Sequence, residues 1–177
     1  STGTFTKVGS GTLTLTGPNT YSGATTVSAG TLLISHNTGL GSTAGGTTVN
    51  SGATLDLYNV TVGAEAITLN GGTLATSTGT SSLSGSVALG ANSIVSVAGT
   101  QLTLSGVISG AGFGITKTDT GILILSGANS YTGVTTISAG TLSVSSLANG
   151  GSNSNIGAST NAAANLVLDG GTLKYTG

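Results

Sequence analysis

The feature that most constrains the fold is a long motif that occurs twice, 110 residues apart. Residues 11–35 read GTLTLTGPNTYSGATTVSAGTLLIS, and residues 121–145 read GILILSGANSYTGVTTISAGTLSVS. Self-similarity at a fixed period is typical of repeat architectures, in which each unit buries its apolar face against its neighbours. The chain is therefore expected to stack repeated units.

A shorter unit lies within this motif and continues between its copies: a strand, a corner of small residues and a second strand. Apolar and β-branched residues alternate with a period of two, and no segment has helical periodicity. Nine such units have a mean spacing of about 20 residues, a plausible length for one coil of a β-solenoid. Examples are TKV-GSG-TLTL, TTV-SAG-TLLI and LVL-DGG-TLKY, and the weakest is LTL-SG-VIS at residues 102–109.

Aligned units predict columns of equivalent residues in a parallel stack. One predicted inward column is Leu13, Leu32, Leu55, Leu74, Ile94, Leu123, Leu142 and Leu173. A second is Val8, Val27, Val49, Leu69, Leu89, Ile137 and Leu168. The predicted outward column is Thr12, Thr31, Thr54, Thr73, Ser93, Ile122, Thr141 and Thr172. A threonine ladder suits an exposed strand face. The columns favour a parallel β-helix over an antiparallel sandwich or hairpin array, which remains the competing all-β interpretation.

Charge is scarce, which excludes several classes of function. The chain has four carboxylates, three lysines and no arginine, so it lacks the basic surface that nucleic-acid binding needs. Cysteine is absent, so no disulfide can form. The carboxylates fall in different units and are expected on the solvated surface; they are Asp56, Glu65, Asp119 and Asp169.

No constellation of catalytic or metal-binding residues is visible in the sequence. Such sites need converging carboxylates or histidines, and His36 is the only histidine. We predict no catalytic, cofactor-binding or metal-binding residue, no cofactor and no enzyme activity. Tyr21 and Tyr131 occupy the same place in the two copies. They could be aromatic platforms for sugars, but we favour an Asn-x-Tyr turn whose ring covers a bend of the helix.

Two connections are longer than the corners. They are residues 36–46 and residues 146–165, and the second is the better candidate for a protruding loop. Both chain ends interrupt the repeat pattern. We therefore expect residues 1–177 to form a single β-helical segment that is a fragment of a longer protein.

The motif resembles a known family. The combination of G-x-L-x-L-x-G, N-x-Y-x-G and T-T-x-x-A-G-T-L in residues 11–35 and 113–145 is similar to the passenger-associated transport repeat, also called the autotransporter-associated β-strand repeat. The resemblance implies a right-handed parallel β-helix in an autotransporter passenger, exported by type V secretion through the periplasm and outer membrane. It also implies that the segment is a stem at the bacterial cell surface or in a secreted protein.

The leading hypothesis is a non-enzymatic structural stem, within an adhesin, that aids secretion and display. Its partners would be flanking β-helix coils or a like subunit at the open ends. One alternative is a binding module for a host or surface glycan or protein; another is a self-stacking extracellular fibre subunit. Ice binding is disfavoured because the second outward column is mixed: Thr14, Leu33, Asp56, Ala75, Ile124, Ser143 and Lys174.

Overall fold

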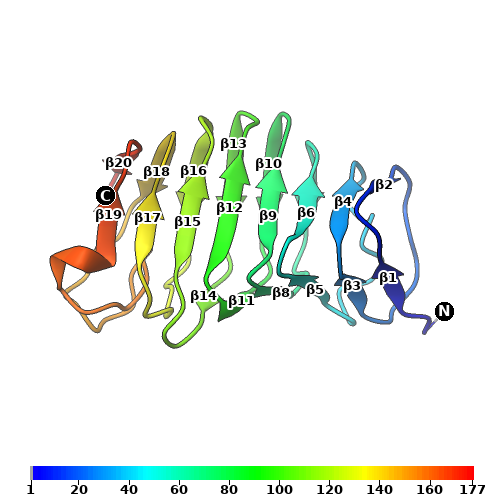
Figure 1. Ribbon diagram of the computed structural model, residues 1–177, viewed down its shortest axis with the longest axis horizontal. Coiled ribbons are helices and arrows are strands. Elements are labelled where there is room, and N and C mark those ends of the chain that lie inside the picture. The colour runs from blue at the N-terminus through cyan, green and yellow to red at the C-terminus, as the bar shows by residue number, and fades with distance from the viewer. Residues whose placement is uncertain (1) are drawn as a thin grey trace.

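The chain folds into a rod of three parallel β-sheets, shown by a computed structural model that describes residues 2–177. Residue 1, the first of the predicted segment, lies outside the described residues. Successive strands step from one sheet to the next, and the two termini lie at opposite ends of the rod (Figure 1). All strand pairs are parallel, so the predicted parallel β-solenoid is confirmed.

Each sheet consists of strands from successive coils. Sheet A contains β1 (Phe5–Lys7), β3 (Thr25–Val27), β5 (Thr47–Asn50), β8 (Ile67–Asn70), β11 (Val87–Ala91) and β14 (Ile108–Ser109). Sheet B contains β2 (Thr12–Leu15), β4 (Gly30–Ile34), β6 (Ala53–Leu57), β9 (Thr73–Thr76), β12 (Ser93–Val97), β15 (Ile115–Thr118), β17 (Thr135–Ile137) and β19 (Leu166–Leu168). Sheet C contains β7 (Thr61–Val62), β10 (Thr80–Leu83), β13 (Gln101–Leu104), β16 (Ile122–Leu125), β18 (Thr141–Val144) and β20 (Thr172–Tyr175). One 3₁₀ turn, η1 (Ala163–Asn165), precedes β19.

The number of coils is smaller than predicted. Eight strands in sheet B correspond to about seven turns, whereas the sequence units suggested nine coils. The surplus comes from the weak unit at residues 102–109, which runs from β13 in sheet C to β14 in sheet A. That unit completes a coil already counted through β12, so it does not add another one.

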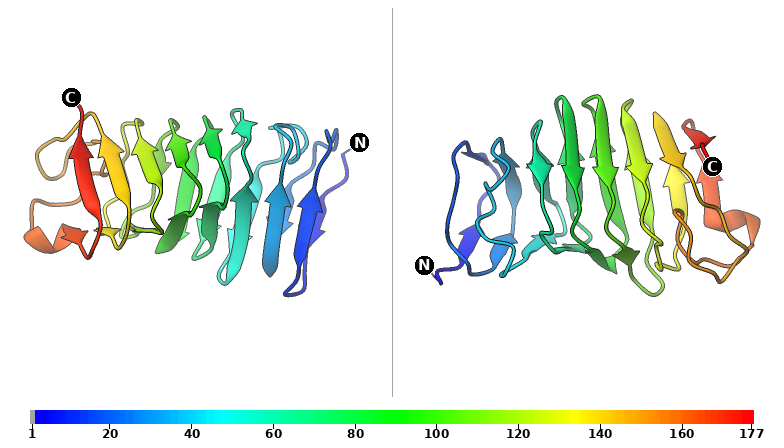
Figure 2. Two further views of the ribbon diagram at one scale, coloured as in Figure 1. Left: turned by 90° about the horizontal axis from the view of Figure 1, so that it is seen from above. Right: turned by 180° about the vertical axis from the view of Figure 1, so that it is seen from behind.

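The two copies of the long motif lie on different faces of the rod. In the first copy, β3 belongs to sheet A and β4 to sheet B. In the second copy, β17 belongs to sheet B and β18 to sheet C. The views in Figure 2 show the three faces along the length of the rod. The predicted columns therefore each cross from one sheet to another. In sheet B, the column that begins with Leu13 continues through Val95, Lys117, Ile137 and Leu168.

Two positions of the predicted inward columns and one of the outward column are wrong. Ile94 is 40% exposed and pairs with Thr73, so Val95 takes the inward position beside Leu74. Ser93, predicted to point outward, is buried. The cause is a register shift between Leu89 and Ala91 in β11, because a shift of one residue turns every following side chain to the opposite face.

The other error lies at the first coil. Val8 is 68% exposed because β1 ends at Lys7 and Val8 begins the corner. Lys7 pairs with Val27 and occupies the inward position. The inward side chains of the coils between the two ends form a continuous core, with Val27, Leu32 and Leu55 fully buried. Each such side chain contributes about 1.5–3 kcal/mol by leaving water.

Candidate functional site

The four carboxylates do not all lie on the surface. Asp119 and Asp169 are exposed, as predicted. Asp56 and Glu65 are buried, so the prediction was wrong for both. Asp56 points outward from β6, but its Oδ1 accepts a hydrogen bond from the backbone N–H of Ser77 in the next coil (3.0 Å). The carboxylate therefore closes a connection between coils.

Glu65 belongs to a polar cluster inside the rod. The Thr47 hydroxyl donates to Glu65 Oε1 (2.7 Å), while Oε2 has no hydrogen-bond partner among residues 2–177. Thr47 stacks on Thr25, whose hydroxyl is 2.9 Å from the Tyr21 hydroxyl. Burial raises the pKa of Glu65 above its ordinary value, and the hydrogen bond from Thr47 partly opposes this rise.

Of the two equivalent tyrosines, Tyr131 fills the interior of the rod and Tyr21 is half-buried. The Tyr131 side chain is fully buried and its hydroxyl is 2.6 Å from the Thr135 hydroxyl. Burial strongly raises the pKa of Tyr131, and the bond to Thr135 acts in the opposite direction. Tyr21 makes the equivalent bond to Thr25, is half-buried and stacks on Phe5 with ring centroids 6.0 Å apart. The ring of Tyr131 is therefore inaccessible to a sugar.

The asparagine of each N-x-Y sequence bonds to the following coil. The Asn19 amide donates to Gly39 O (2.7 Å). Asn129, which is fully buried, donates to Asn155 O (2.7 Å) and accepts from the backbone N–H of Ile108 (2.7 Å). The N-x-Y part of the motif thus has a structural explanation in both copies.

Two buried lysines were missed by the sequence reasoning. Lys7 is 7% exposed and Lys117 is 0% exposed. The Lys7 ammonium donates to Val8 O (2.8 Å), Gly9 O (2.7 Å) and Ala29 O (3.1 Å). A signal was available, because lysine follows the threonine of TKV and TKT at the same place in both copies, where the strand alternation points inward.

The Lys117 ammonium has the equivalent set of partners. It donates to Thr118 O (2.6 Å), Asp119 O (2.7 Å) and Ala139 O (3.3 Å). Burial lowers the pKa of Lys117 below its ordinary value, and the nearby Asp119 carboxylate opposes this. The Asp119 carboxylate itself accepts from the Ser96 hydroxyl (2.6 Å).

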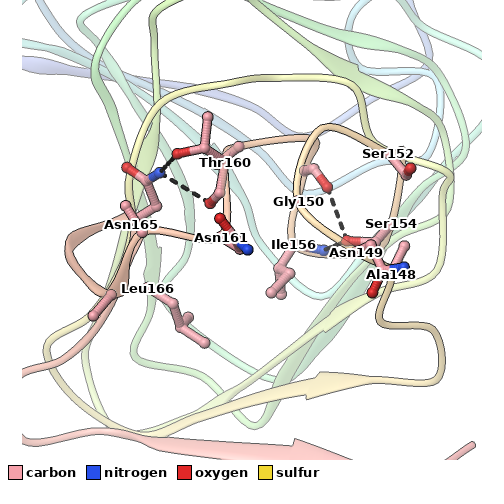
Figure 3. A pocket seen from close by; sticks show the side chains of 14 residues that line it. Ala148, Asn149, Gly150, Ser152, Ser154, Ile156, Thr160, Asn161, Asn165 and Leu166 are labelled. Atoms are coloured by element: carbon pink, nitrogen blue, oxygen red, sulfur yellow. Dashed lines mark hydrogen bonds between the residues drawn. The ribbon is translucent and has the colours of Figure 1, made fainter.

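A hollow lies in the connection from β18 to β19 and is lined by residues between 148 and 166 (Figure 3). Its volume is about 390 Å³, and its lining has amides, hydroxyls and the apolar side chains of Ile156, Leu166 and three alanines, but no charged group. The turn at residues 149–152 is held to the other wall by a hydrogen bond from Gly151 N–H to Ser159 O (2.9 Å). Asn165 Nδ2 donates to the carbonyl and hydroxyl oxygens of Thr160 (3.0 and 2.7 Å). The chemistry of this lining suits a neutral polar ligand.

Residues with metal-binding or acid–base chemistry do not gather elsewhere in residues 2–177. No three His, Cys, Asp or Glu side chains of this part of the chain lie close enough to hold one metal ion. His36 lies in a turn, where its Nδ1 accepts from the backbone N–H of Thr38 (3.2 Å). Within the same residues, no helix has the length and apolar character to cross a membrane.

Comparison with known proteins agrees with the architecture. The passenger-associated transport repeat matches residues 5–34 and 115–144. An autotransporter, adhesin BmaC of Brucella suis biovar 1 (strain 1330), is 46% identical over 181 residues, which cover 98% of this chain. The chain spans only 5% of the length of that relative. No solved structure matches. Two passenger-associated transport repeats therefore lie on one continuous parallel solenoid, and nearly the whole chain is similar to part of an autotransporter adhesin.

Proposed function

We propose that the segment is a non-enzymatic structural stem of an autotransporter passenger at the bacterial cell surface or in a secreted protein, where it aids secretion and displays other parts of the chain. The observation that carries the proposal is the uninterrupted rod: sheet B runs from β2 to β19 through eight parallel strands. Low charge and the scattered carboxylates support a role without catalysis. Similarity to an adhesin supports placing the stem within an adhesin.

The partners proposed for the stem are β-helix coils that flank it, or a like subunit at its open ends. At the first coil, Leu13 is 36% exposed although it lies in the inward column. At the last coil, Leu168 and Tyr175 are 54% and 56% exposed. A further coil would cover these apolar side chains and pair with the free backbone groups of the terminal strands. We propose no nucleic-acid partner, since the segment has only three lysines and no arginine.

A deletion in register tests the stem role in the complete passenger. Thr54 and Thr73 occupy the same register, so deleting residues 54–72 removes one coil and leaves the stack continuous. We expect the shortened protein to reach the surface at the level of the intact protein, as measured by protease accessibility on whole cells. Deleting residues 54–63 alone breaks the register and should reduce display. Loss of adhesion by the in-register deletion, with display intact, would contradict a purely structural role.

A second candidate function is supported by the hollow in the connection from β18 to β19. We propose that it binds a neutral glycan, because Asn149, Asn161 and Asn165 present amide groups at a cavity of sugar size without any charged side chain. Amides and hydroxyls match the alternating donors and acceptors of sugar hydroxyls. Glycan binding at this hollow would be consistent with a segment of an adhesin. It does not require the coils of the stem to take part in binding.

The glycan candidate is tested with substitutions that leave the coils intact. In the complete passenger, Asn149→Ala and Asn161→Ala should reduce binding on an array of neutral glycans by about tenfold each, the loss expected for one good hydrogen bond left unmade in a site. Gln101→Ala on the outer face of sheet C is the matched control and should bind as the unchanged protein does. Equal binding by all variants, or none by the unchanged protein, would reject the hollow as a glycan site.

A further inference from the structure

The buried lysines of the two repeats carry an inference that goes beyond both functions above. We propose that Lys7 and Lys117 are internal cations that clamp consecutive corners of the β-helix, and that fixing the register of those two coils is the task of each passenger-associated transport repeat. The clamp joins one corner to the next because two carbonyl partners lie in the corner that follows the lysine and the third lies one coil further on.

The geometry of the clamp occurs twice with equivalent partners. Gly9 and Asp119 adopt positive φ angles of 73° and 63°. This turn brings their carbonyl oxygens to within 2.7 Å of the Lys7 and Lys117 ammonium groups, respectively. Glycine adopts such a conformation freely, and aspartate tolerates it better than most residues. The corner is therefore shaped to surround an ammonium group.

The third partner comes from the following S-A-G corner. Ala29 O accepts from Lys7 at 3.1 Å and Ala139 O accepts from Lys117 at 3.3 Å. These alanines are followed by Gly30 and Gly140, which both have a φ of 66°. Each ammonium group therefore holds two successive corners, and its hydrogen bonds use all three of its protons.

The clamp belongs to the motif and not to one face of the rod. Lys7 lies in sheet A and Lys117 lies in sheet B, yet both make the same three bonds. In these same columns the neighbouring coils carry apolar residues; Val27 pairs with Lys7, and Val95 and Ile137 pair with Lys117. An apolar residue therefore satisfies the core at this position. Burying an ammonium group there is costly unless its protons are hydrogen-bonded. We therefore assign the lysine the role of binding the carbonyl oxygens of the two corners.

Substitution by methionine separates the charge from the apolar stem of the side chain. In the full chain, Lys117→Met keeps an unbranched apolar side chain but removes the three donors. Backbone hydrogen exchange reports on the clamp locally, since Ser138 N–H donates to Lys117 O (2.9 Å) and Thr141 N–H donates to Gly121 O (3.2 Å). Ser28 and Thr31 make the equivalent bonds at the other clamp, to Lys7 O (2.8 Å) and Gly11 O (3.2 Å).

We expect Lys117→Met to speed exchange at Ser138 and Thr141 by roughly tenfold or more, the effect of losing hydrogen bonds to a charged group. Ser28 and Thr31 should be unaffected, and Lys7→Met should give the reverse pattern. The controls are Ile137→Met, which tests whether methionine fits the column, and Lys174→Met, which removes an exposed lysine. Unchanged exchange in both clamp variants would overturn the proposal, as would equal loosening of both clamps by either variant.

A measurement on the unchanged protein keeps the proposal testable if the variants fail to fold. In nitrogen-15 NMR spectra of lysine side chains, the ammonium protons of Lys7 and Lys117 should exchange slowly with water and give resolved signals at neutral pH. Those of Lys174, which is exposed, should exchange too fast to be seen. Three lysine ammonium groups with the same rapid exchange would contradict the clamp.

Discussion

Several polar residues of the motif lie inside the rod, where they have a structural role. Asn129, Tyr131 and Lys117 are all fully buried, and each bonds to a backbone or side-chain group of its own or the following coil. Buried polar groups are tolerated when their hydrogen-bonding groups are satisfied. These residues therefore specify how coils meet, while the apolar columns supply most of the driving force for stacking.

Glu65 has a buried carboxylate oxygen, Oε2, without a hydrogen-bond partner among residues 2–177, and its burial leads to a pH-dependence of stability. Its folded-state pKa is raised above the ordinary value of 4.5, so the folded protein holds this proton more tightly than the unfolded chain. The contribution of Glu65 to stability is thus greatest below pH 4.5 and is lost as the pH rises through the folded-state pKa. We expect Glu65→Gln to raise the urea midpoint at pH 7 and to flatten its pH-dependence.

The control for this prediction is Asp169→Asn, which removes an exposed carboxylate of equal charge and should leave the midpoint unchanged. Urea titrations at several pH values between 3 and 8 would measure both variants. A lower midpoint for Glu65→Gln at pH 7 would mean that the ionised carboxylate is stabilised by a partner that the hydrogen bonds described above do not include.

At the scale of the element, the corner is the part of each coil with the least freedom. Gly140 has a φ of 66°, and a Cβ atom there would lie 2.5 Å from the carbonyl oxygens of Asp119 and Gly121. Gly30 has the same conformation in the first copy, packed against the preceding corner. The glycine of S-A-G is therefore required by both backbone conformation and close contact.

Substituting this glycine should destabilise the rod more than backbone strain alone explains. Gly52 also has positive φ (75°), but nothing lies within 4 Å of its Cβ position, so Gly52→Ala measures strain without contact. We expect Gly52→Ala to cost about 1 kcal/mol and Gly140→Ala to cost clearly more, about 2–4 kcal/mol. Chemical denaturation measures both costs. Equal costs at the two sites would show that the corners are not closely packed.

The sequence predicted the elements well and their placement on the rod less well. Alternation identified the strands, and Thr31, Thr54 and Thr73 do stack as a ladder. The assignment of units to faces failed because a strand–corner–strand unit has the same sequence pattern whichever two sheets it joins. The one-residue shift before Ser93 cannot be recognised from the sequence pattern, because small residues occupy both the corner and the strand ends.

The candidate site was harder to predict from the sequence than the fold was. The connection at residues 146–165 could be identified from its composition, but the hollow within it depends on how the turn at residues 149–152 packs on Ser159. Lys117 was misjudged for a physical reason. A charged side chain at an inward position contradicts the usual pattern of burial, and only the geometry shows that backbone carbonyl groups surround it.

At the scale of the whole molecule, the rod gains its length by adding coils that contact only their neighbours. Stability in such a solenoid is close to a sum of coil terms and interface terms. The two repeats lie at residues 5–34 and 115–144, and looser units fill the space between them. A rod of this kind can lengthen without a new core.

The central claim is a continuous parallel stack in which the second repeat begins on sheet B. The chain has no cysteine, so pairs of introduced cysteines can report on the register without background. Neighbouring parallel strands are about 4.8 Å apart, which is within reach of a disulfide. Ile94 and Thr116 are register partners on the outer face of sheet B.

We expect the double variant Ile94→Cys/Thr116→Cys to form an intramolecular disulfide under mild oxidation, as measured by mass spectrometry of the digested protein. Ala88→Cys/Thr116→Cys should stay reduced, because Ala88 lies on the outer face of sheet A. That second pair would be close together only if the second repeat began on the same sheet as the first. A disulfide in the second pair and none in the first would contradict the account.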